Sequence, residues 1–441
     1  MTTNSAPLNP PPFPWYTRVW SGVARAAVLR RLHSIRGGEI RLVDSGGEHR
    51  YGDSGDELAT TIRIQSPEAF ARIAFGGTLG VAESYARGLW VVDDLPTLCR
   101  IFARSFLSGD DSWTPKFAEP LARVAHFFRA NSRRGAARNI RDHYDLGNDF
   151  FSLFLDDTMT YSCGVYANAG ASLRDASVEK LDRICRKLDV KPGDRIVEIG
   201  CGWGSFALHA ARNYGAHVTG VTISKEQQDF AEARVREAGL GEQIQIVRRD
   251  YRDLEGQFDH VVSIEMIEAV GDENLETYFA TIDRLLTPRG RALVQAITMP
   301  DRDHAAYLRS VDFIQKYIFP GSCLPCMRRI QESVNGATML RIVDAEDIAL
   351  HYALTLGEWR ERFLAKKDDI LRLGYSENFV RLWDYYFSYC LGGFAERYLG
   401  DLQVLMVKAD VTWDASLQPE PAPTPSLAPL SPRGAATEGA A

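Results

Sequence analysis

The chain has 441 residues, of which 25% are charged and 45% hydrophobic, and its formal net charge is −7. This length exceeds one ordinary core and predicts a large domain with a smaller one. The composition is typical of a folded globular protein, and the acidic balance argues against a general nucleic-acid-binding protein. No stretch reaches the ~18 apolar residues of a membrane-spanning helix, and the Pro-rich start lacks a signal-peptide core. We therefore expect a cytoplasmic protein that is at most peripherally membrane-associated.

The cysteines do not suggest a disulfide framework or a metal centre. They are seven in number and irregularly spaced, which favours a reducing compartment. Cys323 and Cys326 flank Leu-Pro, but no second pair or histidine cluster accompanies them, so no metal is expected.

The first third of the chain predicts a small domain and a connector. Residues 1–15 are Pro-rich and predicted to be disordered, and residues 16–110 predict a small α+β domain. Its strand-like runs are 39–43 and 60–65, and its helices are 67–75 and 79–89. Residues 111–142 are expected to form a basic connector helix. This helix either lies on an anionic membrane surface or is a solvated linker with its Phe pair in the core.

From about residue 190, strands and helices alternate. Strands are predicted at 195–199, 217–221, 244–247, 260–264, 291–298 and 402–408, and helices at 205–213, 225–238 and 274–286. This alternation predicts an α/β fold with a doubly wound parallel sheet covered on both faces, in a domain spanning 143–412. Residues 300–339 interrupt the alternation and are expected to form an insertion over the ligand-binding edge. The Pro/Ala-rich residues 413–441 are predicted to be disordered.

The strongest motif follows the first of these strands. Glu198 precedes a Gly-x-Gly-x-Gly run formed by Gly200, Gly202 and Gly204, and a helix follows directly. Glycines allow a tight turn and close approach of backbone to a ligand. The spacing differs from the pyrophosphate cradle Gly-x-Gly-x-x-Gly, and the acid suits the cationic amino group of a methionine. The motif therefore indicates S-adenosylmethionine (SAM) rather than a dinucleotide.

The next two strand ends supply further candidate cofactor contacts. Thr222 and Gln227 can bond ribose hydroxyls, whereas Ser224 is either a ligand or only a helix N-cap. Asp250 and Tyr251 combine an acid and a ring, which suits an adenine.

Six motifs together resemble those of the cyclopropane-fatty-acyl-phospholipid synthase family, which includes the mycolic acid methyltransferases. They are HYDLGN (143–148), YSCG (161–164), VEIGCGWG (197–204), GVTIS (220–224), SIEMIEAVG (263–271) and KYIFPG (316–321). The resemblance covers about residues 38–409. It implies a class I methyltransferase sheet, SAM as methyl donor and a tunnel for an acyl chain. It also implies that Tyr161 and Ser162 contact SAM.

The resemblance also implies a bicarbonate ion as general base. Its ligands would be Cys163, Glu268, the Ile297 backbone and Tyr352. Gln295 stands where the family has a histidine, and its amide can still donate a hydrogen bond to an anion.

The implied reaction is methyl transfer to the double bond of an unsaturated acyl chain. An isolated alkene is a poor nucleophile and the product is a carbocation, so the site must be dry and aromatic. Tyr144 and Tyr317 are the expected pocket-lining residues, with Phe150, Phe151 and Tyr161 as further candidates. The product is a cyclopropane or, alternatively, a methylene lipid that a separate reductase would convert to a methyl-branched one.

Two other classes remain in competition, namely small-molecule methylation and non-catalytic binding of SAM or lipid. The expected partners are a phospholipid membrane surface and a second copy in a homodimer, with no nucleic acid.

Overall fold

The computed structural model describes residues 21–108, 146–412, 418–427 and 430. The predicted disorder at 1–15, the basic connector at 111–142 and Tyr144 lie outside these ranges. The chain forms two compact units. The small-sheet unit contains Met1–Ala118, Ala353–Tyr398 and Ser426–Ala441, and the large-sheet unit contains Glu119–Tyr352 and Leu399–Pro425. Within the described ranges, no helix has both the length and the apolar character needed to cross a bilayer.

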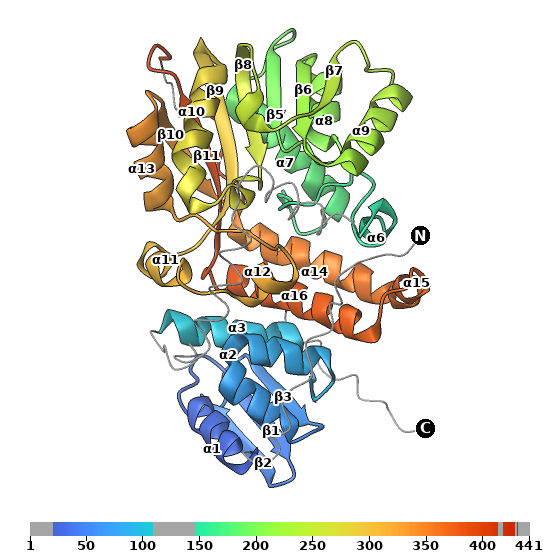
Figure 1. The fold of residues 1–441 in the computed structure, drawn as a ribbon, viewed down its shortest axis with the longest axis vertical. Helices are drawn as coiled ribbons and strands as arrows, with labels where there is room; N and C mark the ends of the chain where they lie inside the picture. Colours follow the sequence, from blue (N-terminus) through green and yellow to red (C-terminus); the bar gives the residue numbers. More distant parts are fainter. Residues whose placement is uncertain (1–20, 109–145, 413–417, 428–429, 431–441) are drawn as a thin grey trace. The chain divides into compact units, whose positions relative to one another are not determined.

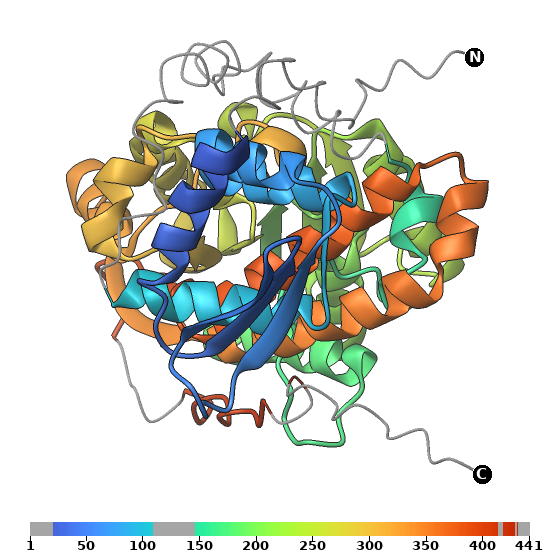
Figure 2. The same ribbon diagram turned by 90° about the horizontal axis from the view of Figure 1, so that it is seen from below.

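The small-sheet unit begins as the predicted α+β domain. Its sheet has the order β2-β1-β3-β4, in which β1 and β3 are parallel and the outer pairs antiparallel. The strands are β1 (Glu39–Asp44), β2 (Gly47–Gly52), β3 (Ala59–Ile64) and β4 (Trp90–Val92), and the helices are α1 (Ser21–Leu32), α2 (Glu68–Ala86) and α3 (Leu95–Leu107) (Figure 2). The two helices predicted at 67–75 and 79–89 are one helix, α2, broken at Gly77, whose φ of 55° is non-helical.

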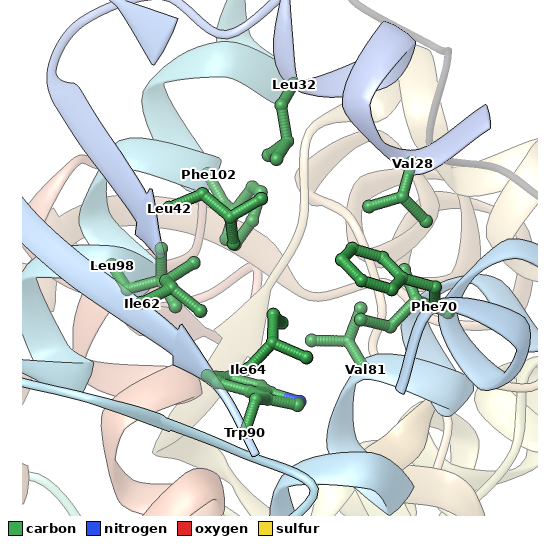
Figure 3. Close-up of a pocket in the computed structure, with 11 residues that line it drawn as sticks. Val28, Leu32, Leu42, Ile62, Ile64, Phe70, Val81, Trp90, Leu98 and Phe102 are labelled. Carbon is green, nitrogen blue, oxygen red and sulfur yellow. The ribbon is translucent and has the colours of Figure 1, made fainter. Parts of the chain in front are cut away.

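Strand and helix side chains of this unit line a small apolar cavity of about 30 Å³ (Figure 3). It is lined by Val28, Leu32, Leu42, Ile62, Ile64, Phe70, Ile73, Val81, Trp90, Leu98 and Phe102. A cavity of this size without polar lining stays dry. It is therefore a packing defect of the core.

The helices after residue 352 complete the small-sheet unit. They are most of α14 (Ala349–Ala365), α15 (Lys367–Arg372) and α16 (Glu377–Ala395). Asp384 of α16 accepts hydrogen bonds from Tyr85 and Arg360, each at 2.6 Å. The prediction of one continuous domain over 143–412 is therefore wrong for residues 353–398, because periodicity locates a helix but not the partner that buries it.

The large-sheet unit contains seven strands in the order β10-β11-β9-β8-β5-β6-β7 (Figure 1). They are β5 (Arg195–Ile199), β6 (His217–Thr222), β7 (Ile244–Arg248), β8 (Phe258–Ile264), β9 (Leu286–Thr298), β10 (Arg341–Asp347) and β11 (Gly400–Val407). β5 to β9 are parallel as predicted, but β11 runs antiparallel to β9 and β10 antiparallel to β11. A strand buried on both faces has the same hydrophobic run in either direction, so composition could not show this reversal.

Helices cover both faces of this sheet, and alternation along the strands divides the core in two. Val261 and Val294 pack towards α10 (Leu275–Leu285) and α13 (Met327–Ala337). Val262 and Leu293 pack on the other face, towards α7 (Leu173–Leu188), α8 (Ser205–Tyr214) and α9 (Lys225–Glu237) (Figure 1).

The predicted insertion contains α11 (Asp301–Tyr307), α12 (Phe313–Tyr317) and α13. Its backbone is tied to the carboxyl ends of two central strands. The Cys323 amide donates to the Glu268 carbonyl at 2.7 Å, and the Met299 amide donates to the Pro325 carbonyl at 3.1 Å. The insertion therefore lies at the predicted edge of the sheet.

Part of the C-terminal tail is ordered against the large-sheet unit. The Ala422 amide donates to Glu346 Oε1 at 2.5 Å, and Arg183 donates to the Glu420 carbonyl at 2.8 Å. The prediction of disorder is wrong for this stretch, because cations of α7 and a strand carboxylate satisfy backbone groups that a Pro-rich segment cannot pair within itself.

Candidate active site

The glycine-rich turn joins β5 to α8 as the sequence predicted. Gly200, Gly202 and Gly204 have φ values of 84°, 52° and 82°, which non-glycine residues rarely adopt. A Cβ on Gly200 would lie 2.7 Å from Met266 Cγ, whereas one on Gly202 would meet nothing within 4 Å. The turn thus combines tight packing beneath Gly200 with open space above Gly202, where a ligand can approach the backbone.

Glu198 lies at the end of β5 beneath this turn. Its side chain is 3% exposed, and Oε2 has no hydrogen-bond partner among the described residues. Burial raises the pKa of this carboxyl to about 8, although the charge of Lys180 opposes the rise. A buried acid with an unused oxygen fits the cationic amino group of SAM, which would supply the missing partner.

The two residues predicted to contact a ribose at the end of β6 are hydrogen-bonded to each other. Thr222 Oγ1 donates to Gln227 Oε1 at 2.8 Å, so the two proposed ribose contacts bond each other and leave the Gln227 amide nitrogen for a ligand. Ser224 caps α9, because its hydroxyl oxygen accepts a hydrogen bond from the backbone N–H of Gln227 at 3.3 Å. For Ser224 the structure therefore supports the capping alternative.

Asp250 and Tyr251 follow β7. Arg252 engages Asp250 with two hydrogen bonds of 2.6 and 2.8 Å, so this carboxylate is already paired. Tyr251 is partly buried, with its ring 5.6 Å from that of Tyr278 in an edge-to-face arrangement. An acid fixed beside a ring remains suited to an adenine amine and face.

The carboxyl ends of β8 and β9 hold a second polar centre, built around Glu265. Glu265 Oε1 accepts from the Cys163 amide and from Gln295 Nε2, both at 2.8 Å. Its Oε2 accepts from the Tyr352 hydroxyl at 2.6 Å. Three of the predicted bicarbonate ligands thus converge on a carboxylate of the protein itself.

Two more carboxyl groups border this centre. Glu268 Oε1 accepts from the Ile297 amide at 2.6 Å, while Oε2 is without a partner among the described residues. Burial and then the charge of Glu265 raise the Glu268 pKa to about 8. Asp401 of β11 is fully buried and accepts from Gln295 Nε2 at 3.0 Å, and burial raises its pKa well above the usual range.

A buried cation acts electrostatically on both centres. Lys180 of α7 is 1% exposed and donates to Ser162 Oγ at 2.8 Å. Burial lowers its pKa, but the charge of Glu265 is the largest opposing influence. Lys180 also acts electrostatically on Glu198, so one ammonium group balances both candidate ligand sites.

Aromatic rings gather beside the glycine-rich turn. The Phe151 ring lies 5.2 Å from that of Tyr161 and 5.1 Å from that of Trp203, and Phe319 of the insertion lies 6.2 Å from Tyr161. Phe150 is wholly buried in the same cluster. Tyr317 lies on α12, where its ring is 5.9 Å from that of Phe313. Dry aromatic walls of this kind can stabilise a developing cation.

The predicted catalytic residues thus contact Glu265 or Glu268, but three important residues were missed. Glu265 directly follows β8, Lys180 lies on α7 and Asp401 lies on β11. Glu265 has a φ of 48°, in the left-handed region that favours glycine. A non-glycine residue held there points to a functional constraint, but it can be recognised only in the structure.

The sheet order, the glycine turn and the acid below it define a class I SAM-dependent methyltransferase. A family model described as mycolic acid cyclopropane synthetase matches residues 131–404, and the chain belongs to this family.

Two relatives resemble much of the chain. The tuberculostearic acid methyltransferase UfaA1 of Mycobacterium tuberculosis is 39% identical over 92% of this chain and 97% of its own. The cyclopropane-fatty-acyl-phospholipid synthase of Escherichia coli is 40% identical over 78% of this chain and 86% of its own.

Solved structures agree with the family. The cyclopropane synthase MmaA2 from Mycobacterium tuberculosis has a TM-score of 0.58 at 29% identity, covering 62% of this chain and 98% of that one. The mycolic acid cyclopropane synthase CmaA1, complexed with SAH and CTAB, has a TM-score of 0.58 at 30% identity and the same coverage.

Proposed function

We propose that this enzyme transfers the methyl group of SAM to the cis double bond of an unsaturated phospholipid acyl chain, and that the product carries an exocyclic methylene group. The observation that carries the proposal is the pairing of a SAM-type turn with a buried proton-accepting centre beside aromatic rings. SAM supplies an electrophilic methyl carbon. Glu198 and the backbone at Gly202 are the groups we assign to holding it.

The reaction makes two demands on the site. The alkene π electrons form the new carbon–carbon bond while the carbon–sulfur electrons leave with the sulfur, so the acyl chain becomes a carbocation. The aromatic cluster around Phe151 and Tyr161 excludes water from this cation. The carboxylate centre then removes a proton, and we assign this part of the site to Glu265, Glu268, Gln295, Tyr352 and the backbones of Cys163 and Ile297.

The product depends on what precedes proton loss. A hydride shift from the methylated carbon followed by loss of a proton from the new methyl group gives the methylene lipid. Ring closure with loss of a methyl proton gives a cyclopropane instead. Gln295 in place of the family histidine and the long match to a tuberculostearic acid methyltransferase support the methylene product. The Escherichia coli relative favours the cyclopropane as the second candidate.

We also propose that the enzyme works at a membrane surface, because its proposed substrate is a phospholipid. Leu308 and Met339, at the ends of the insertion helices, are 44% and 74% exposed. Exposed apolar residues of this kind can enter the bilayer interface. A methylene product would then pass to a separate reductase, which is the class of enzyme that saturates a carbon–carbon double bond.

The test is product analysis with the full-length protein, SAM and oleoyl-phospholipid liposomes. Vinylidene protons in the NMR spectrum of the recovered fatty acid are the expected result, and cyclopropane protons would establish the second candidate. Absence of any added carbon, with SAM binding intact, would refute lipid methylation. The double variant Leu308→Ser, Met339→Ser should lower liposome binding without changing SAM affinity. The matched control Leu373→Ser changes an exposed leucine in the small-sheet unit.

A further inference from the structure

We propose that Glu265 is the general base of this enzyme and that its carboxylate replaces bicarbonate. This inference rests on the proposed methyl transfer and concerns the residue that receives the proton. The proton leaves the new methyl carbon and bonds to a Glu265 oxygen, while the carbon–hydrogen electrons form the new bond of the lipid. The neutral carboxyl later returns its proton to solvent.

The hydrogen bonds to Glu265 are those that a bound anion would need. Three groups donate to its two oxygens within 2.8 Å: the backbone N–H of Cys163, the side-chain amide of Gln295 and the Tyr352 hydroxyl. These donors come from the segment before α7, from β9 and from α14, so the fold converges on this one carboxylate. A bicarbonate ion does not fit here for two reasons. The groups that would donate hydrogen bonds to it already donate to Glu265, and its negative charge would be buried beside three carboxyl groups.

The side chain of Gln295 is suited to donate hydrogen bonds to carboxyl groups of the protein. Its Nε2 carries two N–H groups and donates at once to Glu265 at 2.8 Å and Asp401 at 3.0 Å. Its Oε1 accepts from Gln403 Nε2 at 3.2 Å. Neutral histidine has a single N–H donor and could not serve both carboxyl groups. The departure from the family histidine is thus explained by the presence of Glu265.

Hydrogen bonds and charge single out one of the three carboxyl groups. Burial raises the pKa of all three, that of Glu268 to about 8 and that of Asp401 well above its usual range. Glu265 differs from the other two because it accepts three hydrogen bonds, and these bonds and the positive charge of Lys180 oppose the rise in its pKa. We therefore assign the proton-accepting role to Glu265.

The backbone conformation of Glu265 allows its side chain to be removed without adding strain. Its φ of 48° suits glycine, so Glu265→Gly relieves strain while opening an anion-sized space among the three donors. Glu265→Gln keeps the shape but cannot accept the proton. Asp401→Asn is the matched control, because it makes the same acid-to-amide change in the same cluster, at a carboxyl group to which the proton transfer is not assigned.

Rates of SAM-dependent lipid methylation are measured in carbon-dioxide-free buffer and with millimolar bicarbonate, alongside SAM affinity by calorimetry. The wild type should be unaffected by bicarbonate. Glu265→Gln should lose about 10²-fold or more in kcat with unchanged SAM affinity, as expected for removal of a general base. Asp401→Asn should lose less than about tenfold. Glu265→Gly, alone or with Gln295→His, should be inactive without bicarbonate and regain activity with it.

Two outcomes overturn the inference while leaving the proposed function intact. They are a wild-type enzyme that methylates lipid only when bicarbonate is added, and a Glu265→Gln variant that turns over at the wild-type rate. A wild-type enzyme that binds SAM but methylates no lipid overturns the proposed function, and this inference with it.

Discussion

Replacing Glu198 by glutamine should stabilise the SAM-free protein at neutral pH and weaken SAM binding. Folding raises the pKa of this carboxyl from 4.5 to about 8, mainly by burial. The folded state therefore holds the proton more tightly than the unfolded state. The resulting cost to stability is absent well below pH 4.5, grows as the pH rises and levels off above about pH 8.

The size of the effect follows from linkage. With about 1.4 kcal/mol for each pH unit between the two pKa values, the cost is about 1 kcal/mol at pH 5 and about 3 kcal/mol at pH 7. Glu198→Gln removes this pH-dependent part. The unfolding free energy of the variant, relative to that of the wild type, should therefore rise by about 2 kcal/mol between pH 5 and pH 7. For a unit of this size, this rise corresponds to about 5 °C in Tm.

The assay is thermal unfolding of the wild type and variant at both pH values, with and without SAM. Glu237→Gln, which changes an exposed glutamate on α9, is the control and should show no such trend. With SAM present the advantage of the variant should shrink, because only the wild type forms the buried ion pair, and the variant should lose about 2 kcal/mol or more in SAM affinity. A Tm difference independent of pH, or equal SAM affinities, would refute the assignment of Glu198.

Three further changes test the packing around the site and in the small-sheet unit. Gly200→Ala should abolish measurable SAM binding in calorimetry, since its Cβ would lie 2.7 Å from Met266 Cγ at a φ of 84°; unchanged affinity would contradict the role of this turn. Val81→Ile should raise the unfolding free energy by about 0.5 kcal/mol in urea titrations by filling the apolar cavity, and a loss would mean that the core cannot accept the methylene. Deleting residues 418–441 should lower Tm by removing the amide bound to Glu346, at a cost of about 1–2 kcal/mol in unfolding free energy, and an unchanged Tm would contradict a stabilising role for this contact.

The sequence by itself determined the parallel core of the large sheet and its cofactor turn. β5, the glycine run and α8 follow from local patterns, because a strand period, a tight turn and a helix start are each encoded within a few residues. The motif matches also brought Cys163, Glu268, Gln295, Ile297 and Tyr352 to attention before their proximity was known. These residues lie at the ends of elements whose order the class of sheet dictates.

Only the tertiary structure decided what the centre of the site is. Glu265, Lys180 and Asp401 are far apart in the chain, and each could be an ordinary solvated charge by its local pattern. Their meaning arises from desolvation and mutual charge, which exist only once β8, α7 and β11 lie together. The direction of β11 was undecided for a related reason. A buried apolar segment indicates that it will be covered on both faces, but it specifies neither its direction nor its neighbouring strand.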